Sequence, residues 1–374
     1  MKRLIFTTLL LFAIIVECSA NTTPTRNTVF EKGMSGYSTF RIPTIVRTKN
    51  NTLLAFAEAR RNSSSDTGNI DLVVRRSEDG GKTWGDIIVV WDDADNTCGN
   101  PAPVVEQNSG RVILLMTWNK GTDRERAIMR LTSQDTRRVF ICHSDDDGVS
   151  WSTPKQITSS VKPQEWAWYA TGPCHAIQLQ HKSHRNRIVV PCVHSLYDGK
   201  RTHYNAHLIY SDDCGESWKI GATLSGGNES TVVERADGSL MHNSRWQRGP
   251  AKYARHYAIS NDGGITCGEV IRDKSLIEPV CQGSIIGYTA KNKATNRLLF
   301  SNPASTKQRK MLTIRQSRDG GASWSKGLVI EEGPSAYSDL VILPRKQVGI
   351  LFECGKESPY ERIDFRIVEQ RDLK

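Results

Sequence analysis

The chain of 374 residues carries a formal net charge of +10, and 38% of its residues are hydrophobic. A basic surface attracts anionic partners, nucleic acids and acidic glycans alike, although solubility alone would also account for the charge. The sequence has no zinc-finger spacing, RNA-binding signature or isolated basic helix, which disfavours nucleic acid as a partner. No two cysteines are spaced Cys-x-x-Cys, which disfavours a zinc or thioredoxin-type site.

The first twenty residues differ from the rest of the chain. Two basic residues precede an apolar run over 4–16, and small residues end the segment at Ala20. This pattern predicts a signal peptide over 1–20, and its 13 apolar residues are too few to span a bilayer. We therefore expect the mature chain to be secreted or lumenal, for example lysosomal, and to have no membrane span.

Eight cysteines remain in residues 21–374. They permit disulfides in an exported protein, but about 105 pairings are open and the sequence does not choose among them. Four Asn-x-Ser/Thr sequons, which are acceptors for N-linked glycans, begin at Asn21, Asn50, Asn62 and Asn228.

An arginine stands among β-type apolar residues in the segment Phe40-Arg41-Ile42-Pro43. A guanidinium in such surroundings is costly unless it meets an anion. From these four residues alone, a structural carboxylate and a bound ligand are equally good interpretations of that anion.

A strand is predicted over 52–57, and the loop that follows it contains Asp66 and is rich in Ser, Asn and Gly. Loops of this kind carry functional groups over pockets. Asp71 is the alternative acidic residue, but it falls inside the next predicted strand, over 70–75.

An eight-residue motif, Ser-x-Asp-x-Gly-x-Thr/Ser-Trp, recurs five times with starts separated by 67, 67, 49 and 57 residues. In each copy the aspartate should cap backbone N–H groups, and the glycine should supply a positive φ. The fourth copy ends in Cys267 instead of tryptophan, and the sequence shows no sixth copy. We expect the motif aspartates to be structural and not catalytic: Asp79, Asp146, Asp213, Asp262 and Asp319.

Alternating runs such as 207–210 and 311–315 flank the motifs and indicate strands, so each motif lies in a hairpin turn. Four short strands in roughly 50 to 60 residues, repeated around a ring, describe a propeller blade, and about six such blades fit the mature chain. The sequence shows neither an amphipathic helix nor a linker between domains. It predicts an all-β, six-bladed β-propeller that forms a single domain over 21–374.

The repeated motif is the Asp-box, and five copies after a Phe-Arg-Ile-Pro segment resemble the sialidase superfamily over nearly the whole mature chain. The family comprises exo-α-sialidases, also called neuraminidases. The resemblance implies an enzyme without a metal or other cofactor whose partners are sialylated glycans: glycoproteins, gangliosides or oligosaccharides.

The resemblance also implies three arginines that bind the carboxylate of the substrate, as planar forked donors do well. They are Arg41, Arg245 in His-Asn-Ser-Arg245-Trp, and Arg309 after Asn-Pro-Ala-Ser. The third has basic neighbours that could take its place: Lys307, Lys310 and Arg315.

Near the end of the chain, Glu353 in Leu-Phe-Glu353-Cys-Gly is the implied partner that orients Arg41. The other interpretation is a carboxylate at the rim of the propeller, paired with Lys356. By the same resemblance Asp66 is the acid/base, and Arg60 contacts the O4 side of the sugar.

The implied nucleophile is Tyr337, in Gly-Pro-Ser-Ala-Tyr337-Ser-Asp. A neutral phenol suits an anomeric centre that already bears a carboxylate, because an anionic nucleophile would be repelled there. Since a phenol has a pKa near 10, it needs a base beside it. Glu229 matches that base; Glu234 is the alternative, but it adjoins a surface hairpin turn.

Two further segments, 97–101 and 166–173, resemble loops that line the N-acetyl and glycerol sides of the sugar. They make Asn100 and Tyr169 candidate contacts. If Glu229 is catalytic, a glycan on Asn228 would crowd the pocket, so that sequon should be unused.

These residues together predict a retaining exo-α-sialidase that acts through a tyrosyl intermediate. An intramolecular trans-sialidase, or an enzyme that prefers another nonulosonic acid such as Kdn, would share all of them. A lectin without turnover would be expected to lack Tyr337, Glu229 or Asp66, and an Asp-box glucanase would not require three arginines.

Overall fold

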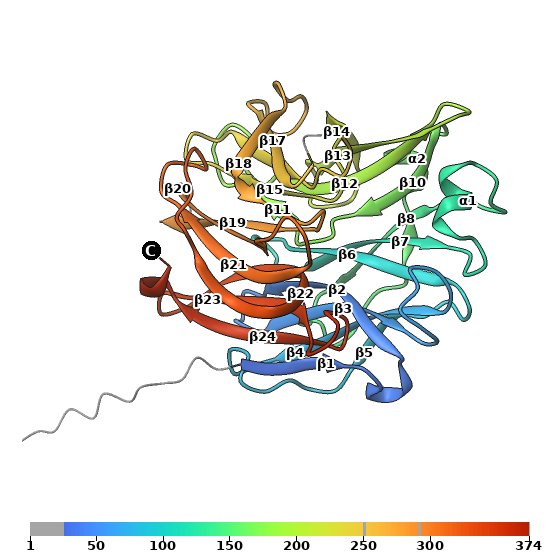
Figure 1. Ribbon diagram of the computed structural model, residues 1–374, viewed down its shortest axis with the longest axis horizontal. Helices are drawn as coiled ribbons and strands as arrows, with labels where there is room; N and C mark the ends of the chain where they lie inside the picture. Colours follow the sequence, from blue (N-terminus) through green and yellow to red (C-terminus); the bar gives the residue numbers. More distant parts are fainter. Residues whose placement is uncertain (1–25, 250–251, 291–292, 374) are drawn as a thin grey trace, which may run out of the picture.

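The computed structural model describes residues 26–249, 252–290 and 293–373. The predicted signal peptide over 1–20 and the sequon at Asn21 lie outside this part of the chain. Within it, antiparallel sheets radiate from a common centre as blades of a six-bladed propeller, which confirms the predicted fold (Figure 1).

The first two blades share one 8-stranded sheet, joined where Ile70 pairs with Thr97. Blade I contains β2 (Thr39–Arg47), β3 (Leu53–Arg60), β4 (Ile70–Ser77) and β5 (Ile88–Trp91). Blade II contains β6 (Thr97–Val105), β7 (Val112–Asn119), β8 (Arg138–Ser144) and β9 (Lys155–Gln156).

The next two blades are separate sheets. Blade III contains β10 (Trp166–Thr171), β12 (Ile188–Tyr197), β13 (Thr202–Ser211) and β14 (Lys219–Ser225), with β11 (Ile177–Gln178) beside β12. Blade IV contains β15 (Ser230–Glu234), β16 (Leu240–Ser244), β17 (Ala254–Ser260) and β18 (Ile271–Ile277).

The last two blades are joined by the long strand β22 (Leu328–Leu343), which is the outer strand of one blade and the inner strand of the next. Blade V contains β19 (Ser284–Ala290), β20 (Lys293–Pro303), β21 (Lys310–Ser317) and the first part of β22. Blade VI contains the rest of β22, β23 (Gln347–Cys354), β24 (Arg362–Glu369) and β1 (Arg26–Glu31).

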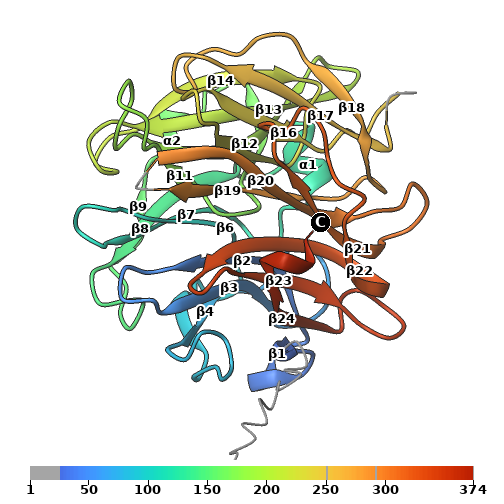
Figure 2. The ribbon, with the colours of Figure 1, turned by 90° about the vertical axis from the view of Figure 1, so that its left-hand side faces the viewer.

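The ring closes where the first strand of the described chain, β1, pairs with the last, β24. Figures 1 and 2 show this blue strand next to the red one. Arg26 and Thr28 on β1 both bond to Asp364 on β24, at 2.7 and 3.0 Å. Closure gives the outer edge of the last blade a partner strand and so removes an exposed sheet edge.

Helices are short: α1 (Glu125–Met129), α2 (Thr158–Val161) and η1 (Met34–Gly36) lie between strands, and η2 (Gln370–Asp372) follows the last strand. None of the helices in the described ranges is long and apolar enough to cross a membrane. The eight cysteines of this part of the chain are all free, so none of them forms a disulfide here.

The five motifs form the hairpin turns that the sequence predicts. In the first, the Asp79 carboxylate accepts bonds from the backbone N–H groups of Lys82 and Thr83, each at 3.0 Å. Gly81 has a φ of 91°, and the corresponding glycine of every other copy is also in the left-handed region. Because these carboxylates are used by their own turns, the interpretation of them as structural residues is confirmed.

The motif tryptophans pack between neighbouring blades. Trp84 of blade I meets Phe365 of blade VI edge to face, with ring centroids 5.5 Å apart. Trp151 of blade II meets Phe56 of blade I in the same way, at 5.6 Å. Aromatic contacts of this geometry add to the apolar burial that holds the blades in the ring.

Three buried histidines cluster on β12, β13 and β16. The Nδ1 atoms of His194 and His207 lie 3.0 Å apart, and His194 stacks on Trp166. His242 is fully buried and neither of its ring nitrogens has a hydrogen-bond partner in the structure. Burial lowers the pKa of His194 and His242 to about 3, and that of His207 well below its usual value.

This cluster predicts that the fold loses stability in mild acid. The three histidines stay neutral in the folded protein, whereas in the unfolded chain they take up protons below about pH 6.5. Their contribution to the free energy of unfolding should therefore be constant above pH 7. Below pH 6.5 it should fall by up to about 1.4 kcal/mol per pH unit for each histidine.

Two further buried histidines change their protonation in the same pH range. Burial lowers the pKa of His256, which adds to the loss. Burial alone would lower the pKa of His175, but Asp339 raises it, so His175 has the opposite sign and offsets one of these four histidines. Urea unfolding of the wild type, His242→Gln and the exposed control His203→Gln at pH 7.5 and 5.5 measures the effect. His242→Gln should reduce the pH dependence by about a third, and an equal free energy of unfolding at both pH values would contradict the prediction.

Candidate active site

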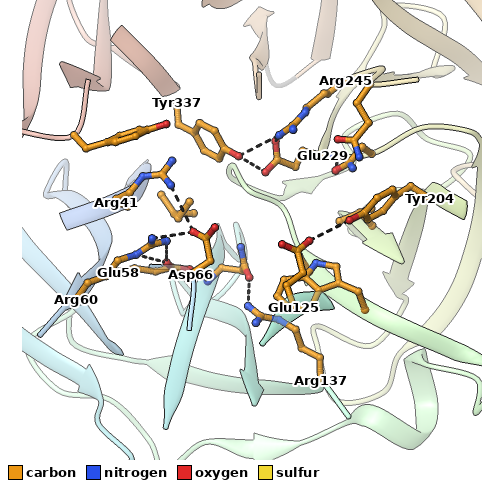
Figure 3. Close-up of a pocket in the computed structure, with 18 of the residues that line it drawn as sticks. Arg41, Glu58, Arg60, Asp66, Glu125, Arg137, Tyr204, Glu229, Arg245 and Tyr337 are labelled. Atoms are coloured by element: carbon orange, nitrogen blue, oxygen red, sulfur yellow. Dashed lines mark hydrogen bonds and ion pairs between the residues drawn. The ribbon is translucent and has the colours of Figure 1, made fainter. Parts of the chain in front are cut away.

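A pocket of about 460 Å³ is lined by side chains from all six blades. Figure 3 shows them pointing into one hollow, with Tyr337 and Glu229 on one side and Asp66, Arg60 and Glu58 on the other. The residues lie on strands and in the segments between them, so the ring of blades brings together positions that are far apart in the chain. Of the ten predicted site residues, all but Tyr169 and Glu353 line this pocket.

Arg41 lies on β2 with only 6% of its surface exposed. Its Nε and Nη2 donate to the two carboxylate oxygens of Glu353 at 3.1 and 3.4 Å. Glu353 is fully buried on β23 and also accepts the backbone N–H groups of Ile42 and Tyr337, at 3.0 and 3.1 Å. The predicted orienting contact is therefore present, and the same carboxylate fixes the strand that carries Tyr337.

Tyr337 lies on β22, and its hydroxyl donates a short hydrogen bond to Oε1 of Glu229. Arg245, which follows β16, forms an ion pair with the other oxygen of Glu229 at 2.5 Å and donates to the Tyr337 hydroxyl at 3.3 Å. Burial raises the pKa of Tyr337 well above its usual value, and the charge of Glu229 adds to this while the nearby arginines oppose it. The phenol is therefore neutral in the free protein and lies next to a base.

Arg309 is the third predicted arginine, and it lies in the loop between β20 and β21. Its Nη1 donates to the Tyr360 hydroxyl at 2.9 Å and its Nη2 to the Val280 carbonyl at 3.2 Å. Its guanidinium carbon is 5.5 Å from the centre of the Tyr337 ring, and that of Arg41 is 5.2 Å from it. Within the described part of the chain, Arg309 has no carboxylate partner, which leaves its charge available to an anion.

Asp66 lies in the loop after β3, and its side chain is 59% exposed. Its Oδ1 forms ion pairs with Nη1 of Arg60 at 2.8 Å and with Nη1 of Arg41 at 3.5 Å. Burial alone would raise the pKa of Asp66, but Arg60 and Arg41 hold it below its usual value. The carboxylate is therefore ionised when the pocket holds no ligand.

Arg60 is almost entirely buried, and its guanidinium is already used by the protein. It bonds to Glu58 through Nε and Nη2, and to Ser64 and Asp66 through Nη1. It lines the pocket as predicted, but it mainly fixes the loop that carries Asp66.

The predicted contact at Tyr169 is wrong, and the residues beside it line the pocket instead. Tyr169 is fully buried, and its hydroxyl bonds to His207 at 3.1 Å behind the wall. Because side chains alternate along a strand, Trp168 and Ala170 of β10 face the pocket and Tyr169 faces the core.

Asn100 does line the pocket, with its Oδ1 bonded to Thr117 at 3.0 Å and to the buried guanidinium of Arg137. The guanidinium carbon of Arg137 lies 4.0 Å from the centre of the Trp168 ring. Burial lowers the pKa of Arg137 to about 10.

The alternatives left open by the sequence lie elsewhere. Asp71 is fully buried and bonds to Tyr37 and Arg61, at 2.5 and 3.0 Å. Glu234 accepts two backbone N–H groups of the segment 180–181 and lines a different cavity. Lys307, Lys310 and Arg315 do not line the pocket.

The sequons of the described chain differ in exposure. Asn228 is 7% exposed and lines the pocket, so a glycan does not fit there, whereas Asn50 and Asn62 are exposed.

Several pocket residues carry no signal in the sequence: Glu58, Glu125, Arg137, Tyr204, Gln247 and Tyr360. Tyr204 donates to Glu125 at 3.0 Å across the pocket from Asp66, and burial raises the pKa of Glu125 (Figure 3). In the described ranges, no three His, Cys, Asp or Glu side chains are placed to hold a metal ion. The polar groups of the pocket are thus arginines, carboxylates, amides and phenols.

The sequence matches the family described as BNR repeat-like domain over residues 51–350. A sialidase of Bacteroides fragilis is 32% identical over 361 residues, and the match covers 91% of this chain but only 64% of that relative. An exo-alpha-sialidase of Aspergillus fumigatus is 30% identical over 343 residues, covering 85% of this chain and 79% of the relative. Among solved structures, the Hadza microbial sialidase Hz136 has a TM-score of 0.82 and 31% identity, over 93% of this chain and 69% of that one.

The arrangement of the arginines predicts that the pocket has affinity for a sugar that bears a carboxylate. Arg41→Lys keeps the charge but loses the fork that Glu353 orients, so affinity should fall by roughly 2 kcal/mol or more. Calorimetric titration with the 2,3-unsaturated glycal of sialic acid measures the loss. Arg47→Lys, on the same strand but outside this pocket, is the control; an unchanged Kd for Arg41→Lys would remove Arg41 from the ligand site.

Proposed function

The chain belongs to the sialidase family, and from this premise we propose that it is a retaining exo-α-sialidase. Its substrates are terminal sialic acids on glycoproteins, glycolipids or oligosaccharides. The observation that carries the proposal is the hydrogen bond of Tyr337 to Glu229, within reach of Arg41, Arg245 and Arg309. A buried phenol with its own base, among three cations, fits a reaction centre that bears a carboxylate.

In the first step, the Tyr337 oxygen attacks the anomeric carbon while its proton passes to Glu229. The bond from that carbon to the leaving oxygen breaks, and Asp66 supplies the proton to the leaving oxygen. The product is a tyrosyl glycoside in which the carboxylate of the sugar is held by the arginines. The separation of two acid/base groups on opposite sides of the pocket supports these roles (Figure 3).

In the second step, Asp66 takes a proton from water, and the water oxygen attacks the anomeric carbon. The bond to Tyr337 breaks, and Glu229 returns the proton to the phenolate. Two displacements at one carbon retain the anomeric configuration, so the first product is the α-anomer.

We also propose that the chain is exported, to the outside of the cell or to a lumenal compartment. The basic and apolar segment over 1–20 supports export. The cysteines do not contribute to this argument, because those in the described chain are free. Comparison of the N-terminal sequence of the purified native protein with residue 21 tests the cleavage.

The tyrosyl intermediate can be trapped. A 3-fluoro sialosyl fluoride should label the wild type on the peptide that contains Tyr337. The fluorine at C3 slows both steps, but the fluoride leaving group keeps the first step fast, so the intermediate accumulates. Glu229→Gln should lower the labelling rate by roughly 100-fold or more, since the base is lost. Tyr288→Phe, a buried tyrosine outside the pocket, should label like the wild type.

Mass spectrometry of the labelled peptides and NMR of the released sugar read the result. Labelling of Asp66 or Glu229, or β-anomer as first product, would overturn the mechanism. With 3′- and 6′-sialyllactose, free acid supports hydrolysis and an anhydro sugar identifies an intramolecular trans-sialidase. Binding without any product would identify a lectin. Faster turnover of the matching Kdn glycoside than of sialyllactose would identify a Kdn-preferring enzyme.

Asp66 is expected to matter most where the leaving group is poor. Asp66→Asn should lower kcat/KM on 3′-sialyllactose by roughly 100-fold or more, but on a 4-nitrophenyl sialoside by much less, because nitrophenolate leaves without a proton. Steady-state rates on the two substrates give the ratio. Asp71→Asn is the matched control and should leave the ratio unchanged; equal losses on both substrates would mean that Asp66 only shapes its loop.

A further inference from the structure

Glu58 is a buried carboxylate of the pocket wall to which the proposed mechanism gives no role. It lies on β3, two residues before Arg60, so the two side chains share one face of the strand. Its Oε2 accepts Nε and Nη2 of Arg60 at 3.2 and 2.5 Å. Its Oε1 accepts the backbone N–H of Asn100 at 2.9 Å, and so joins blade I to blade II.

The contact of Glu58 with blade II requires a residue without a side chain at position 99. A Cβ atom on Gly99 would overlap Oε1 of Glu58. Asn100, the next residue, has a φ of 54°, which a non-glycine residue rarely adopts. The chain therefore bends at 99–100 so that a backbone N–H reaches Glu58, and the same bend presents the Asn100 side chain to the pocket.

The orientation of Arg60 follows from Glu58. With Nε and Nη2 fixed by one carboxylate, the fork of Arg60 aims Nη1 at the loop over 61–69. There it donates to the Ser64 carbonyl at 2.6 Å and pairs with Asp66 at 2.8 Å. Asp66 is more than half exposed, and its one other ion-pair partner in the described ranges, Arg41, is 3.5 Å away. The place of Asp66 therefore depends on Arg60, and that of Arg60 on Glu58.

Glu58 also balances charge. Arg60 lies between two carboxylates, and it lowers the pKa of Asp66. If the charge of Glu58 were removed, the positive charge of Arg60 would act on Asp66 alone. The proton of Asp66 would then be lost at lower pH, and a general acid that has lost its proton cannot assist a leaving group.

We propose that Glu58 is a positioning residue for the acid/base step: it orients and neutralises Arg60, so that Asp66 faces the leaving group and can carry a proton when the substrate is bound. The inference rests on the proposed sialidase function. In this inference Arg60 acts mainly by positioning Asp66 and less by contacting the sugar.

Glu58→Gln in the full chain tests the proposal, because it keeps the shape of the side chain and removes its charge. On 3′-sialyllactose, kcat should fall roughly 10- to 100-fold while KM changes by no more than about threefold. The alkaline limb of the plot of kcat against pH should move to lower pH by about one unit. On a 4-nitrophenyl sialoside, kcat should fall by less than about fivefold. Glu58→Asp, which restores the charge, should return the limb toward its wild-type position.

A double variant separates positioning from general damage. If Glu58 acts through Asp66, then Glu58→Gln should cost little more in an Asp66→Asn background. Arg60→Lys should show the same selective loss on the alkyl substrate, and it serves if Glu58→Gln does not fold. Glu106→Gln is the control: Glu106 is a buried carboxylate that accepts N–H groups of Asn108 and Ser109 outside the pocket, and its variant should keep the wild-type profile.

The failures are distinguishable. If the wild type releases no sugar from either substrate, the proposed function is wrong. The wild type could instead be active while Glu58→Gln leaves the alkaline limb in place or lowers kcat equally on both substrates. The losses of Glu58→Gln and Asp66→Asn could also multiply in the double variant. In any of these cases, only the proposed role of Glu58 is wrong.

Discussion

The carboxylate of Asp339 joins the inner elements of the propeller, and the pocket is built on the strands that it holds. Its Oδ2 accepts Thr44 and Ile45 of β2 at 2.7 and 3.0 Å. Its Oδ1 accepts Ser284 of β19 at 2.7 Å and bonds to the ring of His175, before β11, at 2.8 Å. Burial alone would raise the pKa of this fully buried group, but His175 and the other donors hold it down, so it stays charged. The catalytic candidates lie a few residues from these bonds: Tyr337 is two residues before Asp339, and Arg41 three before Thr44.

A second constraint is that each buried cation of the pocket needs an acceptor. Arg41, Arg245 and Arg60 have carboxylate partners: Glu353, Glu229 and Glu58, respectively. Each of these carboxylates has another bond as well, to a backbone N–H or to the Tyr337 hydroxyl. A buried carboxylate with several donors is rigid, so each arginine and the group beside it are placed together. Arg309 and Arg137 differ, because their acceptors are hydroxyl, amide and carbonyl oxygens.

These contacts explain how far the sequence could be interpreted. The Asp-box turns were predictable because aspartate and glycine at fixed places dictate a turn locally, whatever surrounds it. The arginines, Tyr337 and Glu229 were found through family motifs that are short and specific. Glu58 and Arg137 were not, because each lies in a strand or at its edge among other charged residues, and their partners lie on other strands. Glu58 meets the backbone of Asn100 across the contact of blade I with blade II. Arg137 meets Thr117, Asn119 and Asn100 on two strands of blade II. Tyr169 was misplaced because β10 is buried on both faces, so no alternation of polar and apolar residues shows which side chains face the pocket.

The proposed nucleophile and the proposed acid/base are fixed by the protein to different degrees. Tyr337 is 6% exposed on a central strand, whereas Asp66 is more than half exposed on a loop that two arginines hold. Arg41 is shared, because it pairs with Asp66 and is also a predicted ligand of the substrate carboxylate. We expect that when that carboxylate binds, its negative charge competes with Asp66 for Arg41 and repels the charge of Asp66. Both effects raise the pKa of Asp66 from its lowered value in the free protein. Binding of an anionic substrate thus favours protonation of the group that must donate a proton, and an uncharged sugar of the same shape would leave Asp66 ionised.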